Sequence, residues 1–233
     1  MSEQLIEFRA EMESSLLWRL EEYRRLKNTI KEDNKVAVVK VLIVMLYAHF
    51  EGFYKDCMDY YIDFINSTQL ELECLNTSLI AASLHREFSS FEDTNRKCRE
   101  LTTTPPVEDY LHRFHRRKEL TKIFNTSYLT KKVKIKDLVV NTKSNLSFQV
   151  WQENFYILGL DVTLFSDYQK NIDKLVNLRN NIAHGSQKEP LDYSEFDSLE
   201  FKIIELMEKL IVYLYEYCFE NKYMKINEEI SLQ

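Results

Sequence analysis

Apolar residues recur every three or four positions along most of the chain, which is the spacing of one face of an α-helix. Long rows of this kind predict amphipathic helices over residues 5–31, 36–64 and 193–221. The row over 36–64 gives the strongest prediction, and its apolar positions are Val39, Ile43, Leu46, Phe50, Phe53, Cys57, Tyr60 and Phe64. We therefore expect a bundle of long antiparallel helices that pack through their apolar faces.

Shorter helices are predicted between the long ones. We expect one or two over residues 70–84, one over 107–124 and one over 147–159. A further helix is expected to begin at Ser166 and Gln169, which have the spacing of a capping box. In that motif the two side chains satisfy free backbone amides in the first helical turn.

The composition supports an all-α fold. Only 3 glycines and 3 prolines occur in 233 residues, so the chain has few places for tight turns or helix breaks. A hydrophobic content of 45% is enough for a substantial core, and no Gly-rich or Pro-rich linker divides the chain. We therefore predict a single helical domain over residues 1–233.

Cysteine usage and the N-terminus suggest a soluble protein of the cytoplasm. The four cysteines are scattered without a C-x-x-C pair, which predicts buried free thiols rather than a zinc ribbon or a disulfide framework. The N-terminus is polar and acidic, unlike a secretory signal, and no uninterrupted apolar stretch is long enough to span a bilayer. We expect no metal, no cofactor and no membrane partner.

Charge is distributed unevenly along the chain. The formal net charge of −6 argues against a protein that coats nucleic acid through its overall charge. Residues 113–143 are nevertheless strongly basic, and their cations are Arg113, Arg116, Arg117, Lys118, Lys122, Lys131, Lys132, Lys134, Lys136 and Lys143. An apolar run over 133–140 predicts a short strand or an extended arm. We predict a basic helix plus an extended insertion over 107–145, which either forms a solvated face or gathers RNA phosphates.

Residues 175–185 contain the most unusual local pattern. An apolar row at helical spacing, through Leu175 and Val176, reaches Arg179 at a place where a core residue is expected. His184 directly precedes a glycine, a residue suited to the left-handed conformation that ends a helix. An imidazole there lies at the negative end of the helix dipole, which favours its protonated form. Arg179 and His184 together therefore suggest a phosphate-binding site.

The segment from Arg179 to His184 reads R-N-N-I-A-H and matches the R-x(4–6)-H motif of the HEPN superfamily, including the usual polar residue after the arginine, here Asn180. The motif stands at the end of a predicted helix in an all-α chain, and a further long helix follows it, as in that superfamily. Over residues 36–217 the chain resembles the stand-alone bacterial HEPN ribonucleases of the defence and toxin–antitoxin type.

A second cluster supports the same resemblance. Residues 47–55 contain His49, Glu51 and Lys55 among aromatic residues, and they are similar to a cluster in an early helix of those ribonucleases. One position departs from the pattern. The branch that is silenced by tyrosine modification carries the tyrosine two residues after the histidine, whereas this chain has Ser186, which argues against that form of regulation.

The resemblance implies a metal-independent endoribonuclease that acts as a homodimer on RNA such as tRNA or mRNA, with two motif helices facing each other across a composite cleft. Arg179 and His184 would be catalytic together with Asn180 and Glu51. Nearby substrate contacts would come from His49 and Lys55, and further contacts from Arg113, Arg116, Arg117, Lys131 and Lys132. A separate antitoxin or sensor protein would control the activity.

Other interpretations of the same residues stay open at this point. Arg179 would form a buried ion pair with a carboxylate such as Glu51 that only ties two helices together, and His184 would only cap its helix. The protein would then be a non-catalytic HEPN-type module that binds nucleotides or a partner protein, or an antitoxin-like helical scaffold. Geometry separates these cases, because burial of His184 against core side chains would exclude the nuclease.

Overall fold

The computed structural model describes residues 2–31, 35–100, 110–125, 128–136, 140–143, 145–186 and 192–225. Within these residues the chain forms eight α-helices, short 3₁₀ turns and no named strand, which confirms the all-α prediction. The helices are α1 (Ser2–Lys27), α2 (Lys35–Ser67), α3 (Thr77–Ser83), α4 (His85–Glu92), α5 (Tyr110–Asn125), α6 (Phe148–Leu158), α7 (Gln169–Ala183) and α8 (Tyr193–Phe219).

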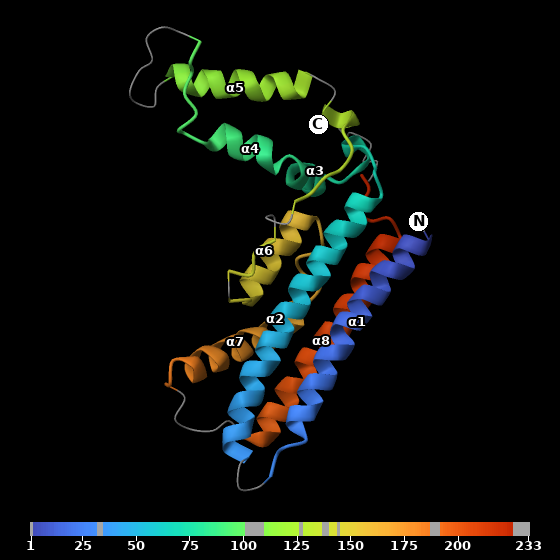
Figure 1. Ribbon diagram of the computed structural model, residues 1–233, viewed down its shortest axis with the longest axis vertical. Coiled ribbons are helices and arrows are strands. Elements are labelled where there is room, and N and C mark those ends of the chain that lie inside the picture. The colour runs from blue at the N-terminus through green and yellow to red at the C-terminus, as the bar shows by residue number, and fades with distance from the viewer. Residues whose placement is uncertain are drawn as a thin grey trace.

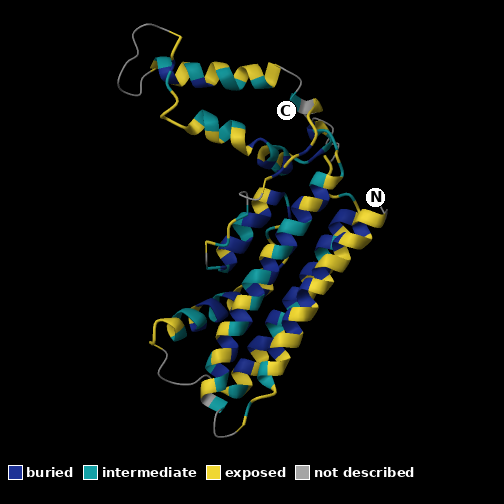
Figure 2. Cartoon of the chain, viewed as in Figure 1, coloured by how far each residue is buried: buried dark blue, intermediate teal, exposed yellow. Residues whose placement is uncertain are grey.

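The long helices α1, α2 and α8 form a bundle along the long axis of the molecule (Figure 1). Each of the three packs against the other two, and α2 also packs against α7. Figure 2 shows that each helix turns a buried face inward and an exposed face outward. The strong periodicity of α2 follows from this position, because its apolar side chains meet α1, α7 and α8.

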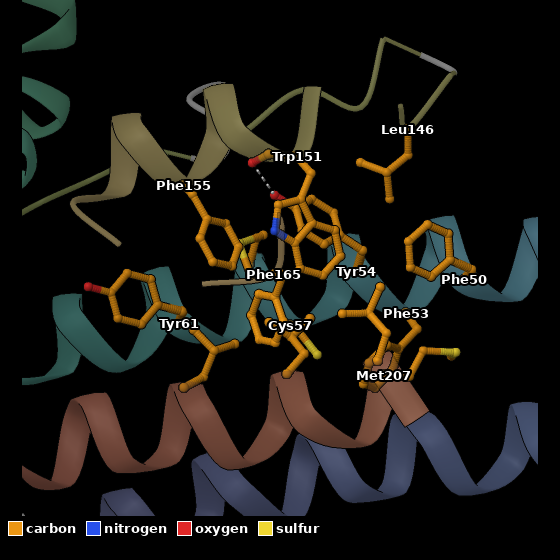
Figure 3. Close-up of a cluster of buried hydrophobic side chains, with 14 of the residues drawn as sticks. Phe50, Phe53, Tyr54, Cys57, Tyr61, Leu146, Trp151, Phe155, Phe165 and Met207 are labelled. Atoms are coloured by element: carbon orange, nitrogen blue, oxygen red, sulfur yellow. Dashed lines mark hydrogen bonds between the residues drawn. The ribbon is translucent and has the colours of Figure 1, made fainter. Parts of the chain in front are cut away.

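An aromatic cluster joins α6 to this bundle (Figure 3). The ring centroid of Trp151 in α6 lies 4.4 Å from that of Tyr54 in α2, and the Tyr54 hydroxyl donates a hydrogen bond to the Trp151 carbonyl oxygen at 3.3 Å. Phe165, which follows α6, packs edge-on against Trp151 with a centroid distance of 5.6 Å. The cluster therefore holds α6 and the approach to α7 against α2.

The predicted boundaries of α6 are confirmed. The Ser147 hydroxyl oxygen accepts a hydrogen bond from the Val150 amide at 3.4 Å, and Gly159 ends the helix with a φ of 72°. The capping-box prediction for α7 is wrong. Residues Ser166–Tyr168 form a 3₁₀ turn before α7, and the Ser166 hydroxyl donates to the Thr163 carbonyl oxygen at 2.6 Å. This tighter turn points the Tyr168 side chain into the core, which the capping box would not do.

Helices α4 and α5 extend beyond the bundle, next to the C-terminal end of α2 (Figure 1). The segment 131–136 returns from them in an extended conformation, and its Val133 amide donates a backbone hydrogen bond of 2.8 Å to the turn after α2. Its pairing consists of an isolated bridge between Lys132 and Glu71, so the described part is an extended arm rather than a strand. The apolar positions expected at 137–139 lie outside the described residues.

Helix α2 departs from one expectation of the sequence analysis. Its stretch Ala37–Ser67 is long and apolar enough to cross a membrane, with a mean hydropathy of 1.5 over its most apolar window. In the structure α2 packs against α1, α7 and α8, which is the environment of a core helix. Its high hydropathy is therefore explained by contacts within the protein.

Candidate active site

Helix α7 carries the R-x4-H motif and ends in a Schellman turn. The Ser186 amide donates to the Asn181 carbonyl oxygen at 2.9 Å, and the Gly185 amide donates to the Ile182 carbonyl oxygen at 3.1 Å. Gly185 has a φ of 70°, in the left-handed region, and a Cβ there would meet no atom within 4 Å. Backbone conformation alone therefore explains the glycine, and the turn fixes where His184 leaves the helix.

Arg179 lies over the aromatic face of Tyr47, a residue of α2. The guanidinium carbon is 4.0 Å from the ring centroid, and Nη1 donates a hydrogen bond of 2.9 Å to the Asn180 side-chain oxygen. The arginine thus interrupts the apolar row of α7 because it faces an aromatic ring and an amide. A guanidinium stacked in this way keeps its N–H donors in one plane, the geometry that matches phosphate oxygens.

The loop before α6 holds Tyr47 and Asn180 in place. The Tyr47 hydroxyl oxygen accepts a hydrogen bond from the Leu146 amide at 2.8 Å, and Tyr47 is only 3% exposed. The neighbouring Asn145 accepts a longer hydrogen bond, 3.4 Å, from the Asn180 side-chain nitrogen. Residues from α2, α7 and this loop therefore form one polar network around the Arg179 guanidinium.

Glu51 follows Tyr47 by one turn on the same side of α2. Its Oε1 atom is buried and has no hydrogen-bond partner among the described residues. Burial raises the pKa of the Tyr47 hydroxyl and the Glu51 carboxylate adds to this rise, whereas the Leu146 amide and Arg179 oppose it. The carboxylate therefore acts electrostatically on the network around Arg179.

His184 is exposed, so the burial that would exclude a nuclease is not found. His184 follows Arg179 by five residues, which places it about 140° around the helix axis at 3.6 residues per turn. Asn180 is only about 40° from His184 by the same rule. The hydrogen bond to Asn180 draws the guanidinium toward the side of His184, but the two residues leave α7 in different directions.

A shallow groove of about 580 Å³ runs along the face of α7 that continues to His184. Its lining residues are Gln169, Lys170, Asp173, Lys174, Asn177, Leu178 and Asn181. Asn181 precedes His184 by three residues, so the two are neighbours on the helix surface. The groove offers ammonium and amide donors beside the histidine.

The structure places His49 away from this network. Its Nε2 atom lies 3.4 Å from a carboxylate oxygen of Glu22 in α1, and its ring packs edge-on against Trp18 at 5.6 Å. Burial lowers the pKa of His49, an effect that Glu22 opposes. His49 and Tyr47 are two residues apart and therefore about 200° apart around α2, so His49 faces α1.

The basic region lies at the other end of the molecule from the end of α7 (Figure 1). Arg113 and Arg117 are exposed on α5. Lys131 pairs with Glu87, and Lys132 pairs with Glu71, each at 3.3 Å. Within one chain the structure therefore does not bring these cations beside Arg179 and His184.

Arg116 differs from the expected surface cation, because it is only 6% exposed. Its Nε atom donates a hydrogen bond of 2.8 Å to the Phe91 carbonyl oxygen, and Nη1 lies 3.4 Å from the Arg96 carbonyl oxygen. These acceptors belong to α4 and the segment that follows it. The guanidinium holds α5 against that segment and is not presented on the surface.

Two residues of the network were not selected from the sequence. Tyr47 precedes Glu51 by four residues, so its spacing already placed it on the same helical face. Asn145 lies in a loop, where no periodic pattern indicates which side chain turns toward α7. Among the described residues, no group of three or more His, Cys, Asp or Glu side chains is arranged to hold a metal ion.

Comparison with known proteins identifies the family. A family model described as RiboL-PSP-HEPN matches residues 14–216, a range that contains both the Tyr47–Glu51 turn and the R-x4-H motif. Searches of curated proteins and of solved structures give no match. The family match covers most of the chain, and the matched chain is all-α and carries the motif at the end of α7. The protein therefore belongs to the RiboL-PSP-HEPN family within the HEPN superfamily.

Proposed function

We propose that the protein is a metal-independent endoribonuclease whose active site is assembled from the α7 helices of two chains. The observation that carries the proposal is the placement of the R-x4-H pair, with Arg179 held on Tyr47 and His184 exposed at the helix end. HEPN domains generally act on RNA and often dimerise, which supports the proposal at the level of the superfamily.

RNA cleavage without a metal makes three chemical demands. A base must deprotonate the 2′-hydroxyl, a cation must stabilise the charge on the phosphorane, and an acid must protonate the leaving 5′-oxygen. An imidazole transfers protons near neutral pH, and a guanidinium binds phosphate oxygens through its planar fork. In this proposal His184 moves the protons and Arg179 clamps the phosphate.

Asn180 and Glu51 support these two groups. Asn180 accepts the hydrogen bond that draws the Arg179 guanidinium toward the side of His184. Glu51 supplies negative charge beside the Tyr47 ring on which the guanidinium lies. Lys55, which is exposed one turn beyond Glu51, is placed to contact RNA next to this network.

A second chain supplies what one chain lacks. One copy of the motif provides a single histidine, and that histidine leaves α7 about 140° away from Arg179. Two copies related by a two-fold axis provide a base, an acid and two guanidinium groups for one phosphate. We therefore propose a homodimer in which the two α7 ends meet, and an isolated chain that is inactive.

The setting that fits this activity is growth arrest or antiviral defence in a bacterial cytoplasm, with tRNA or mRNA as substrate. The four cysteines are free thiols, as expected for a reducing compartment. Control would then come from a separate antitoxin or sensor protein. These finer assignments rest on the resemblance to the toxin and defence branch of HEPN ribonucleases.

The test incubates purified protein with total RNA in EDTA and compares wild type with Arg179→Ala and His184→Ala. We expect cleavage by wild type that leaves 2′,3′-cyclic phosphate ends, and loss of cleavage in both variants. Cleavage that survives both substitutions would remove the mechanism, and cleavage abolished by EDTA would indicate a metal enzyme. RNA binding without any cleavage would favour the non-catalytic HEPN-type module instead.

A further inference from the structure

A groove lined by cations lies between the extended arm and the start of α4. Its volume is about 390 Å³, and its lining residues are Leu72, Ser83, Leu84, Arg86, Glu87, Lys131, Lys132, Lys134 and Lys136. We call this feature the lysine groove. Five of its lining residues are cations, and a single carboxylate, Glu87, lines it with them. This is a concentrated positive surface in a chain whose net charge is −6.

Not all of these cations are neutralised by neighbours. Lys131 and Lys132 pair with Glu87 and Glu71, whereas Arg86, Lys134 and Lys136 have no ion pair within 4.0 Å among the described residues. Cations without a nearby carboxylate keep their full potential and attract anions from solution. The lysine groove therefore presents free charge as well as paired charge.

The spacing of the lysines favours a chain of phosphates over a single anion. Val133 and Ile135 are buried, so Lys132, Lys134 and Lys136 alternate with them and point away from the core. Alternate residues of an extended chain are about 6.6 Å apart, which forms a short row of evenly spaced charges. A nucleic-acid backbone is the polyanion whose charges repeat in this way.

The lysine groove is far from the Arg179 network. Ile135 is fixed to α2 by two hydrogen bonds with the Asn66 side chain, 2.8 and 2.9 Å long, whereas Arg179 lies over Tyr47. These two anchor points are 19 residues apart on one continuous helix, or about 29 Å at 1.5 Å per residue. At about 3.4 Å per base step, that separation corresponds to roughly nine stacked nucleotides.

We propose that the lysine groove is a second RNA-contact site, which holds the strand or duplex that flanks the cleaved bond. This inference rests on the proposed ribonuclease function and specifies its substrate class: an RNA long enough to span about 29 Å, such as a folded RNA. A short oligonucleotide reaches the motif alone and gains nothing from the groove.

The experiment uses Lys134→Ala/Lys136→Ala in the full-length protein. Both side chains are exposed, so the fold is retained, which circular dichroism checks. The matched control is Arg24→Ala/Arg25→Ala, which removes the same charge from an exposed part of α1. Binding is measured in EDTA in a His184→Ala background by fluorescence anisotropy, with a hairpin RNA of about 30 nucleotides and a single strand of about four.

We expect the groove variant to lose about tenfold in affinity for the hairpin, and the slope of log affinity against log salt to fall by about 1.4, at 0.7 per lost phosphate contact. Affinity for the short strand stays unchanged, and the control behaves like the parent. Equal slopes in the groove variant and the control would overturn the proposal. Equal losses for the hairpin and the short strand would overturn it as well.

Cleavage separates this inference from the proposed function. With His184 intact, the groove variant should cut the hairpin with a raised KM and cut the short strand at the wild-type rate. Hairpin binding that depends on the groove, without any cleavage, would uphold the groove and remove the ribonuclease. Cleavage that depends on Arg179 and His184 but proceeds at wild-type rates on both RNAs would remove the groove alone.

Discussion

Replacing Tyr47 by leucine removes the aromatic face beneath Arg179 but keeps an apolar side chain in the core. The guanidinium carbon lies 4.0 Å from the ring centroid, and the ring itself is only 3% exposed. A cation–π contact contributes about 0.5–1 kcal/mol at an exposed site and about 2 kcal/mol when it is desolvated. Because the ring is buried and Arg179 is half-buried, we expect a coupling of about 1–2 kcal/mol between the two residues.

A double-mutant cycle measures this coupling without relying on catalysis. The cycle combines Tyr47→Leu with Arg179→Met, which keeps the aliphatic stem of the arginine and removes its charge. Urea unfolding of the four proteins gives the interaction free energy. The control cycle pairs Tyr54→Leu with Arg179→Met, because Tyr54 is a buried tyrosine of α2 that packs on Trp151 instead. A Tyr47–Arg179 coupling below about 0.5 kcal/mol, like that expected for independent sites, would refute the stacking argument.

The same contact should matter for RNA cleavage. Loss of about 1–2 kcal/mol in the orientation of Arg179 corresponds to a drop of roughly 5-fold to 30-fold in kcat/KM. Tyr47→Phe keeps the ring, so we expect a smaller drop from that variant. If Tyr47→Leu and Tyr54→Leu reduced kcat/KM equally, the effect would come from general destabilisation and not from Arg179.

Three further predictions concern stability, each measured by chemical or thermal unfolding. Gly185→Ala should cost about 1–2 kcal/mol, because φ is 70° and no atom obstructs a Cβ, whereas Gly159→Ala should cost more because its Cβ would lie 2.6 Å from the Asn76 side chain. Trp151→Ala should cost about 3–5 kcal/mol, and a loss below about 1 kcal/mol would contradict the aromatic core. Burial lowers the pKa of His49 below its ordinary 6.5, so the unfolded chain takes up the proton first on acidification. His49 therefore contributes stability that is present above about pH 6.5 and lost as the pH falls toward the folded-state pKa, and His49→Gln should flatten the decline between about pH 7.5 and 5.5.

The helices could be predicted from the sequence because their signals are local. Apolar periodicity located α1, α2 and α8, and the Ser147 and Gly159 positions located the ends of α6. The start of α7 was misjudged because Ser166 and Gln169 have the right spacing for a capping box, while burial of Tyr168 selects a 3₁₀ turn. Tertiary packing decided that position against the local pattern.

The candidate site was predictable in part for the same reason. Arg179 and His184 could be selected because a motif and a helix end both lie in one short segment. Which face of α2 meets α7 is a tertiary property, so Tyr47 was overlooked and His49 was expected at a site from which it points away. Periodicity also could not show that Arg116 faces α4, since arginines on the two sides of α5 look alike in sequence.

The central claim is that two copies of the motif build one active site, and a subunit-mixing measurement tests it most directly. Wild-type and His184→Ala chains are co-expressed in equal amounts, so that they assemble at random, and RNA cleavage is measured in EDTA at constant total protein. If both histidines of a dimer are needed, only dimers of two wild-type chains cut RNA, and the activity is about one quarter of that of wild type. An activity of one half would show that each chain works alone and would contradict the composite site.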